Sequence, residues 1–255
     1  MMMLLGDIAG LSGAQLEGAA ELHSRAGILD DVAQWLGRSQ KTLGTLFRGV
    51  QPASNSMVDA VTHMLAMHDP ETLGHSQRVA RYALALGDAM GLDSDQLGTL
   101  QLGGLLHDIG KISVPEKVLR KTGKLDDWDW QQLRGHPEHG HKLLRRFSAL
   151  QPALPVVRHH HERYDGNGYP DKLKGLGIPL AARIFAVIDT FDAMTSDRPY
   201  RRALSAAEAQ AEIERGAGSQ FDPRVVERFL AVDSQKWSAL TSACASVSTA
   251  SSHLA

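Results

Sequence analysis

The 255-residue chain has a single cysteine, Cys244, and this scarcity restricts what the protein can be. One thiol excludes an internal disulfide framework and any zinc module built from several cysteines. Long apolar runs are also missing, since no segment approaches the roughly 18–20 residues that a membrane-spanning helix needs. The opening residues, MMMLLGDIAGL, lack the charged region and the cleavage site of a signal peptide. These absences predict a cytoplasmic protein without a membrane span.

An excess of charge of one sign is lacking as well. The chain has 27 Lys and Arg residues against 29 Asp and Glu residues, for a formal net charge of −2 at pH 7. A protein that binds DNA or RNA generally carries a strongly basic face, so we expect no nucleic-acid partner. A few well-placed cations are still enough to bind a small anionic ligand.

Histidine, by contrast, is concentrated in one part of the chain. Nine of the twelve histidines lie between His68 and His161, and no cysteine lies among them. Imidazoles among carboxylates, without thiolates, are typical ligands of iron, manganese, zinc or nickel, whereas structural zinc sites usually contain cysteine. The central part of the chain therefore predicts a metal site.

Apolar residues recur at helical spacing along most of the chain, and no strand-like alternation or internal repeat is evident. We predict an all-α protein with an N-terminal helical extension over 1–54, a main domain over 55–232 and a disordered, Ser/Ala-rich tail over 233–255. The expected helices of the main domain span 56–68, 71–91, 94–109, 126–147 with a break at 135–137, 149–161, 180–196, 205–215 and 222–231.

Two pairs of candidate ligands come from the first helices of this domain. Glu71 and His75 lie four residues apart, so both side chains lie on one face of a helix. Either that face is exposed to solvent, or the two side chains bind one or two cations. His107 and Asp108 end an apolar segment that carries them into the interior. A buried carboxylate needs a positive partner, and the alternatives for Asp108 are a metal ion and Lys111.

The remaining histidines form two short clusters. His136, His139 and His141 fall within six residues, and all three cannot face one point from a helix. Three consecutive histidines follow at 159–161. Neighbours on a helix are about 100° apart, so two of these three can address the same centre.

Charged residues near the end of the domain complete the candidates. Asp189 follows a long apolar run, so we expect it to be buried and compensated, with Asp192 as a competitor for the same role. Arg198 and Arg201 form a basic patch that is either suited to phosphate or part of a solvent-exposed loop.

Taken in order, these motifs resemble the HD-GYP family, a branch of the HD-domain metal-dependent phosphohydrolases. The resemblance runs from about residue 57 to residue 231. Its parts are Glu71-x3-His75, His107-Asp108-x2-Lys111, His136, His160-His161-Glu162, Asp165-Gly-x-Gly-Tyr-Pro170 and Asp189. A His-Asp dipeptide alone is common, but its combination with His-His-Glu-Arg-x-Asp-Gly-x-Gly-Tyr-Pro is specific. The resemblance implies an HD-domain helical bundle.

The resemblance also implies two or three divalent metal ions, with iron or manganese favoured over zinc or nickel. The implied ligands are His75, His107, Asp108, His136, His160, His161 and Asp189. Asp108 would bridge two ions, and Glu71 occupies the place of an additional carboxylate in members with a third ion. His159 would then be a spare imidazole, and His139 and His141 would lie at the surface.

The activity that the resemblance implies is hydrolysis of cyclic di-GMP to pGpG, GMP or both, by a hydroxide that bridges two metal ions. Asp108 and Lys111 would belong to the catalytic set. The implied substrate contacts are Lys111, Gly168, Tyr169, Pro170, Arg198 and Arg201. A homodimer or a signalling partner would involve the N-terminal helices, unless residues 1–54 only pack on the domain.

Other functions stay open at this point. Cyclic GMP-AMP is an alternative substrate. A catalytically weak or inactive module that binds a cyclic dinucleotide or docks a signalling partner is the alternative to an enzyme, but every ligand position and the Gly168-Tyr169-Pro170 loop are present. That loop also speaks against an HD-domain hydrolase of ppGpp or dNTPs.

Overall fold

The computed structural model describes residues 58, 61, 62, 64, 65, 67–69, 72–197, 202–233, 237 and 240. The chain divides into two units, Met1–Ala53 and Ser54–Ala255, and all described residues belong to the second. The predicted extension over 1–54 therefore lies outside the described residues, as do Glu71, Arg198 and Arg201. Apart from one isolated bridge, the regular structure of the described residues is helical, which confirms the all-α prediction.

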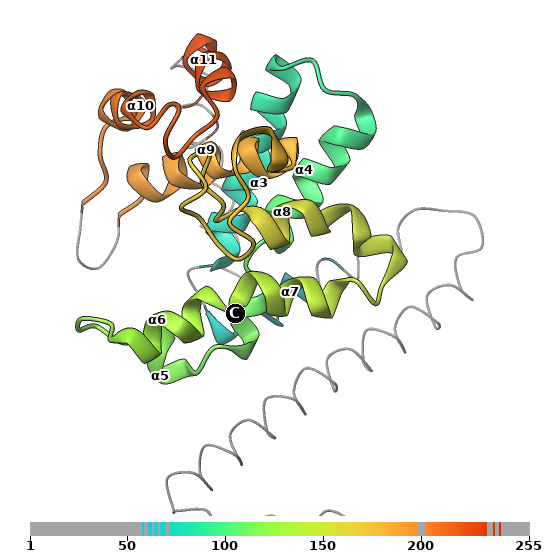
Figure 1. Ribbon diagram of the computed structural model, residues 1–255, viewed down its shortest axis with the longest axis vertical. Helices are drawn as coiled ribbons and strands as arrows, with labels where there is room; N and C mark the ends of the chain where they lie inside the picture. The colour runs from blue at the N-terminus through green and yellow to red at the C-terminus, as the bar shows by residue number, and fades with distance from the viewer. Residues whose placement is uncertain are drawn as a thin grey trace, which may run out of the picture. The chain divides into compact units, whose positions relative to one another are not determined.

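The helices lie close to their predicted positions. The helix expected over 94–109 ends earlier, at Leu106, and the chain continues as the 3₁₀ turn η1. The helix expected over 149–161 begins as a 3₁₀ segment, η2, which contains Pro152, a residue without an N–H to donate. The elements (Figure 1) are α3 (Thr72–Ala89), α4 (Ser94–Leu106), η1 (Ile109–Ser113), α5 (Glu116–Leu119), α6 (Asp127–Arg134), α7 (His136–Leu144), η2 (Ser148–Ala153), α8 (Leu154–His159), η3 (Gly175–Gly177), α9 (Leu180–Thr195), α10 (Ala206–Arg215) and α11 (Pro223–Ala231).

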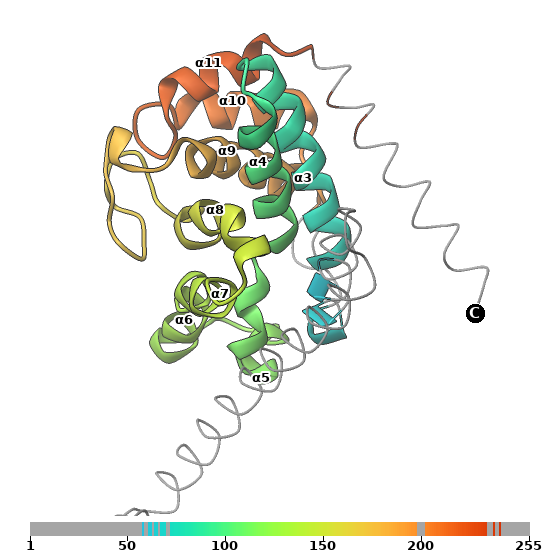
Figure 2. The same cartoon turned by 90° about the vertical axis from the view of Figure 1, so that its right-hand side faces the viewer.

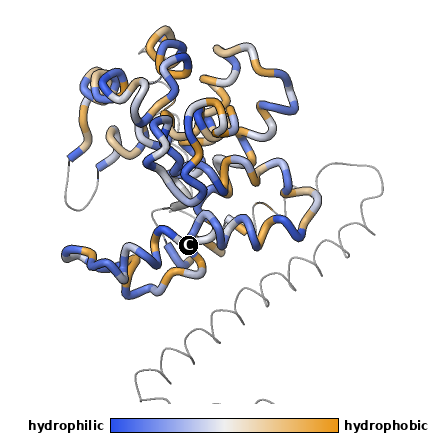
Figure 3. Tube along the Cα trace, in the orientation of Figure 1, coloured by the Kyte–Doolittle hydropathy of each residue, from blue (hydrophilic) through white to orange (hydrophobic). Residues whose placement is uncertain are grey.

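Helix α3 packs against α4 and α9, and α8 packs against α4, α7 and α9 (Figure 2). In that view α10 and α11 lie at one end of these helices, and α5, α6 and α7 lie at the other. Hydrophobic and hydrophilic residues alternate along most of the helices (Figure 3), as expected for helices that bury one face. Within the described part of the chain, no helix combines the length and low charge that crossing a bilayer requires.

Four aromatic side chains form the centre of the core between α3, α9 and α11. Tyr82, Phe191, Phe229 and Trp237 are almost fully buried, and their rings contact one another at centroid distances of 5.1 to 5.8 Å. Trp237 lies in the segment predicted to be a disordered tail, so that expectation does not hold at this residue. A single tryptophan in a Ser/Ala-rich stretch creates no periodicity, and the sequence therefore gave no sign of its burial.

A buried ion pair joins α9 to the start of α11. Asp222 is 2% exposed, pairs with Arg183 of α9 and accepts a hydrogen bond from the Arg224 N–H at 3.0 Å. Burial alone would raise the pKa of Asp222, but the hydrogen bonds from Arg183 and Arg224 hold it below its ordinary value. The ion pair therefore stabilises the fold fully at pH values above about 4, the ordinary pKa of aspartate. This stabilisation is lost as the pH falls below that value.

We expect Asp222→Ala to lower the free energy of unfolding by about 3 kcal/mol at pH 7, because it leaves the guanidinium of Arg183 buried without its partner. Urea unfolding followed by circular dichroism measures this difference. The difference should shrink as the pH falls below about 4. Glu116→Ala, which breaks an exposed pair with Arg120, is the control and should cost at most about 1 kcal/mol. Equal effects of the two variants would contradict this account of Asp222.

Candidate metal centre

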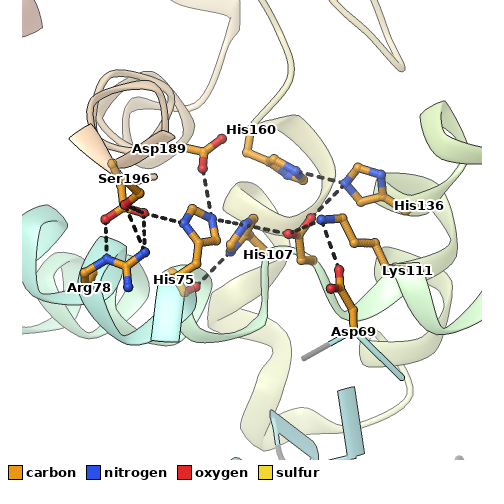
Figure 4. Close-up of polar contacts among 12 residues, drawn as sticks. Asp69, His75, Arg78, His107, Lys111, His136, His160, Asp189 and Ser196 are labelled. Carbon is orange, nitrogen blue, oxygen red and sulfur yellow. Dashed lines mark hydrogen bonds and ion pairs between the residues drawn. The ribbon is translucent and has the colours of Figure 1, made fainter. Parts of the chain in front are cut away.

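The structure brings seven of the predicted ligands to one place, where five parts of the chain meet. Their positions are His75 on α3, His107 and Asp108 after the end of α4, His136 at the start of α7, His160 and His161 after the end of α8, and Asp189 on α9. Figure 4 labels five of them, namely His75, His107, His136, His160 and Asp189. Glu71, the eighth predicted ligand, lies outside the described residues.

One group of donors consists of His75, His107 and Asp189, whose ligand atoms lie within 4.8 Å of one another. Nε2 of His75 is 3.3 Å from Nε2 of His107 and 3.2 Å from Oδ1 of Asp189. The group has the composition and size of one metal-binding position.

A second group consists of His136, His160 and His161, again with ligand atoms within 4.8 Å of one another. Nε2 of His136 and Nε2 of His160 are 3.1 Å apart. His136 and His160 are each 3% exposed, so bulk water barely reaches these two rings. This group has the composition of a second metal-binding position.

Asp108 lies between the two groups and is 5% exposed. Its Oδ2 atom is 3.2 Å from Nε2 of His107 in the first group, and its Oδ1 atom is 3.3 Å from Nε2 of His136 in the second. One carboxylate oxygen thus faces each group. This is the arrangement of a carboxylate that bridges two cations.

Hydrogen bonds to the main chain fix the tautomers of three of these histidines. The Nδ1 atoms of His107, His136 and His160 lie 2.6 to 3.1 Å from carbonyl oxygens three or four residues earlier in the chain. A carbonyl only accepts hydrogen bonds, so each Nδ1 carries the proton. Each Nε2 therefore presents a lone pair to the centre, as a metal ligand must.

The resulting contacts fit divalent cations. The Nε2 lone pairs of His136 and His160 face each other at 3.1 Å, which is repulsive unless a positive charge lies between them. Protons cannot supply that charge at neutral pH, because burial lowers the pKa of His136 to about 3 and holds that of His160 well below its ordinary value. Three imidazoles and a carboxylate oxygen form a donor set suited to iron, manganese, zinc or nickel.

His75 shows that the first group also favours a positive charge. Burial would lower the pKa of His75, but hydrogen bonds with Asp189 and Asp192 outweigh burial and raise it to about 9. The two carboxylates thus stabilise a cation beside Nε2. A metal ion would provide that charge while the ring stays neutral.

Asp192 orients His75, a role that differs from the one considered for it from the sequence. Oδ2 of Asp192 is 2.7 Å from Nδ1 of His75, on the side of the ring that faces away from the centre. Arg78 binds both oxygens of Asp192, at 2.7 and 2.9 Å. Asp192 is therefore a partner of a ligand and no competitor of Asp189. In the sequence Arg78 follows His75 by three residues and Asp192 follows Asp189 by three, so each pair lies on one face of its helix, but this spacing does not show that the two faces meet.

Lys111 lies beside the bridging carboxylate. Its Nζ atom is 2.8 Å from Oδ2 of Asp108 and 3.7 Å from Oδ2 of Asp69, a residue that the sequence analysis missed. Burial alone would raise the pKa of Asp108, but the neighbouring His107 and the ammonium group of Lys111 hold it well below its ordinary value. From the sequence, Lys111 and a metal ion were alternative partners of Asp108. In the structure Asp108 contacts Lys111 and also faces both donor groups.

A glycine allows the turn with Lys111 to approach α7. A Cβ atom added to Gly110 would lie only 1.9 Å from the carbonyl oxygen of His136. No side chain fits in this space, so η1 packs directly on the first turn of α7. This contact sets the distance between Asp108 and His136.

The predicted substrate loop lies against the second group. The ring of Tyr169 stacks on that of His161, with centroids 4.8 Å apart. A Cβ atom added to Gly168 would come within 2.3 Å of the main-chain nitrogen of Arg163, so this position also requires glycine. The half-buried Pro170 follows Tyr169 away from the metal centre and borders a second cavity.

The buried Glu162 anchors this loop. Its two oxygens accept hydrogen bonds from the main-chain nitrogens of Asp171, at 2.7 Å, and Leu173, at 3.1 Å. His159 lies near Glu162 and Asp171, but Arg158 occupies the carboxylate of Asp171 with two bonds of 2.7 Å. The acids of this small cluster are thus already satisfied, and His159 remains outside the metal centre as expected.

His139 and His141 are half-buried and do not belong to either group of donors. Nδ1 of His139 instead contacts Oγ of Ser113 at 2.6 Å. The expectation that both histidines lie at the surface therefore holds only in part.

A cavity of about 450 Å³ opens onto the first group, the bridging aspartate and His161. Residues at and just after the end of α9 contribute to its lining. The lining residues are Asp69, His75, Arg78, His107, Asp108, Lys111, His161, Asp189, Asp192, Ala193, Ser196 and Asp197.

Comparison with known proteins agrees with this geometry. A family model described as HD domain matches residues 59–225. The cyclic di-GMP phosphodiesterase response regulator RpfG of Xanthomonas campestris is 35% identical over 85% of this chain and 56% of its own length. A cyclic di-GMP phosphodiesterase of Pseudomonas aeruginosa is 43% identical over 65% of this chain and 40% of its own length. A 3'3'-cGAMP-specific phosphodiesterase of Vibrio cholerae is 33% identical over 71% of this chain and 35% of its own length. The chain thus spans little more than half of these relatives at most.

Proposed function

Because this chain belongs to the HD-domain family, as its resemblance to the HD-GYP branch predicted, we propose that it is a metal-dependent phosphodiesterase that hydrolyses cyclic di-GMP to pGpG, GMP or both. The observation that carries the proposal is the pair of donor groups joined by Asp108. The names of the relatives supply the substrate class.

Each donor group would hold one divalent ion. His75, His107 and Asp189 would bind the first, His136, His160 and His161 the second, and Asp108 both. We propose iron or manganese in these positions, with zinc and nickel as the next candidates. Glu71 is proposed as the ligand of a third ion.

Bound divalent ions lower the pKa of water and polarise phosphoryl oxygens, which is the chemistry that phosphodiester hydrolysis needs. The chain's own residues prepare the site for it. Lys111 keeps its proton, because the neighbouring Asp108 outweighs burial and raises the pKa of the lysine. Its ammonium group lies at the cavity, where it can neutralise the non-bridging oxygens of the phosphate.

The remaining substrate contacts are proposed from their positions in the chain. Ser196 and Asp197 line the cavity, and Arg198 follows directly, so Arg198 and Arg201 would bind the phosphates of the substrate. Tyr169 would contact the substrate from its position on His161. We also propose a cytoplasmic location, because the proposed substrate is a nucleotide messenger.

Chromatography of the products formed from cyclic di-GMP by the anaerobically purified protein tests the proposal. We expect linear pGpG or GMP to form, and we expect a chelator to stop the reaction. A parallel reaction with 3'3'-cGAMP shows which dinucleotide is preferred. Binding of either dinucleotide without turnover, in a protein that holds its metals, would contradict the proposed activity and support the alternative of a binding module.

A further inference from the structure

A row of stacked side chains leads from the metal centre to the surface. Tyr169 stacks on His161, and the guanidinium group of Arg134 lies 5.7 Å from the centre of the Tyr169 ring. The same guanidinium lies 5.6 Å from the centre of the Trp130 ring, so Arg134 contacts two aromatic rings. Trp130 is 47% exposed. The row therefore ends in an indole ring that is open to solvent.

Trp130 and Arg134 border a second cavity, of about 530 Å³, which is lined by residues of α6 and α7 and by Pro170. Trp130, Arg134 and Pro170 line it together with two carboxylates, Asp127 and Glu138. Because Pro170 follows Tyr169 directly, the cavity lies next to the loop that borders the metal centre. An exposed aromatic ring, an arginine and two acids thus surround one space.

Arg134 is suited to bind a ligand here. Its interactions with other described residues are the two ring contacts, without a carboxylate partner among them. Contact with two rings holds the position of the guanidinium plane and leaves its N–H groups without an acceptor among the described residues. Such a group can make the two parallel hydrogen bonds that an arginine offers to a planar acceptor pair.

Trp128 gives a useful contrast on the same helix. It is 44% exposed and contacts Lys117, with the ammonium group 5.0 Å from the ring centre. It lines neither of the two cavities described above. Exposure of tryptophan on α6 alone therefore does not define a site, whereas the position of Trp130 beside Arg134 and the Tyr169 loop does.

We propose that Trp130 and Arg134 form a guanine-binding subsite next to the metal centre, an inference that rests on the proposed function and names the part of the chain that recognises a base. The base would stack on the indole of Trp130. Arg134 would donate two hydrogen bonds to O6 and N7 of guanine, and the acids of the cavity would accept from the N–H groups of the base. A phosphate alone would leave the indole unused, and an aliphatic group would leave the guanidinium unused.

Calorimetric titration of the metal-loaded protein with GMP and with ribose 5-phosphate tests the subsite. The ratio of the two affinities isolates the contribution of the base, because both probes carry the same phosphate. We expect GMP to bind at least about tenfold more tightly to the wild type. Trp130→Ala should bring the ratio close to one, Trp130→Phe should keep most of it, and Trp128→Ala, the matched control, should keep all of it. An unchanged ratio in Trp130→Ala, or no preference for GMP in the wild type, would overturn the proposal.

Arg134→Lys tests the choice of base with the charge retained. Lysine cannot reproduce the paired hydrogen bonds of a guanidinium, so we expect the preference of the wild type for GMP over AMP to fall by about tenfold. An unchanged preference would overturn the role of Arg134. These binding ratios do not depend on turnover. The expected ratios can be absent from a protein that hydrolyses cyclic di-GMP, and they can be found in a protein that does not hydrolyse it.

Discussion

The Asp108→Asn variant should lose at least about a thousandfold in the rate of cyclic di-GMP hydrolysis and should retain fewer metal ions per chain. Asparagine keeps the shape of the side chain but removes the negative charge that lies between the two groups of donors. Its amide has one oxygen, so it can face only one of the two cation positions with an acceptor. Rates from product chromatography and metal content from elemental analysis measure the effect.

Loss of stability must be separated from loss of function, because Asp108 is also the partner of Lys111. Asp222→Asn is the matched control, since Asp222 is also a buried aspartate, and neither it nor its partner Arg183 belongs to a donor group. Both variants should unfold more easily, but only Asp108→Asn should lose metal. Similar metal content in the two variants would contradict the bridging role of Asp108.

Asp192→Ala should weaken metal binding by about 10- to 100-fold through His75. Without the carboxylate, Nδ1 of His75 loses the acceptor that fixes its proton, and Arg78 loses its two hydrogen bonds to Asp192. Because Asp192 holds a ligand in place and does not itself face the centre, we expect excess metal to restore most of the hydrolysis rate. Titration of the metal-free protein with manganese, with the rate as the readout, measures both effects.

Asp192→Asn provides the comparison for this role. Its amide oxygen still accepts a hydrogen bond from Nδ1 of His75, so it should keep more metal affinity than Asp192→Ala. Metal affinities equal to that of the wild type in both variants would show that His75 needs no partner. A rate that excess metal does not restore would mean that Asp192 acts directly on the reaction.

Local patterns were enough to predict most of the helices and to mark candidate ligands, and the resemblance to the HD-GYP family selected among these candidates the residues that meet at the centre. His107 and Asp108 follow an apolar segment, and His160 and His161 precede a glycine-rich loop, so their placement depends on features that are near in sequence. The caps of the helices are equally local, as in the Asp93 and Gln96 pair that begins α4.

Features that depend on distant partners could not be predicted in the same way. Asp192 looked like a competitor of Asp189 until its contacts with His75 and Arg78, more than a hundred residues earlier, were known. Trp130 and Arg134 carry no family motif, and their relation to the centre arises only because α6 ends beside the Tyr169 loop. The burial of one residue such as Trp237 likewise depends on tertiary packing rather than on its neighbours in the sequence.

The number of metal ions per chain tests the central claim most directly. Elemental analysis of the anaerobically purified protein, related to its protein concentration, gives this number. Two donor groups joined by one carboxylate predict at least two divalent transition-metal ions per chain, and a value near three would support the proposed role of Glu71. A value of one or fewer would contradict the account.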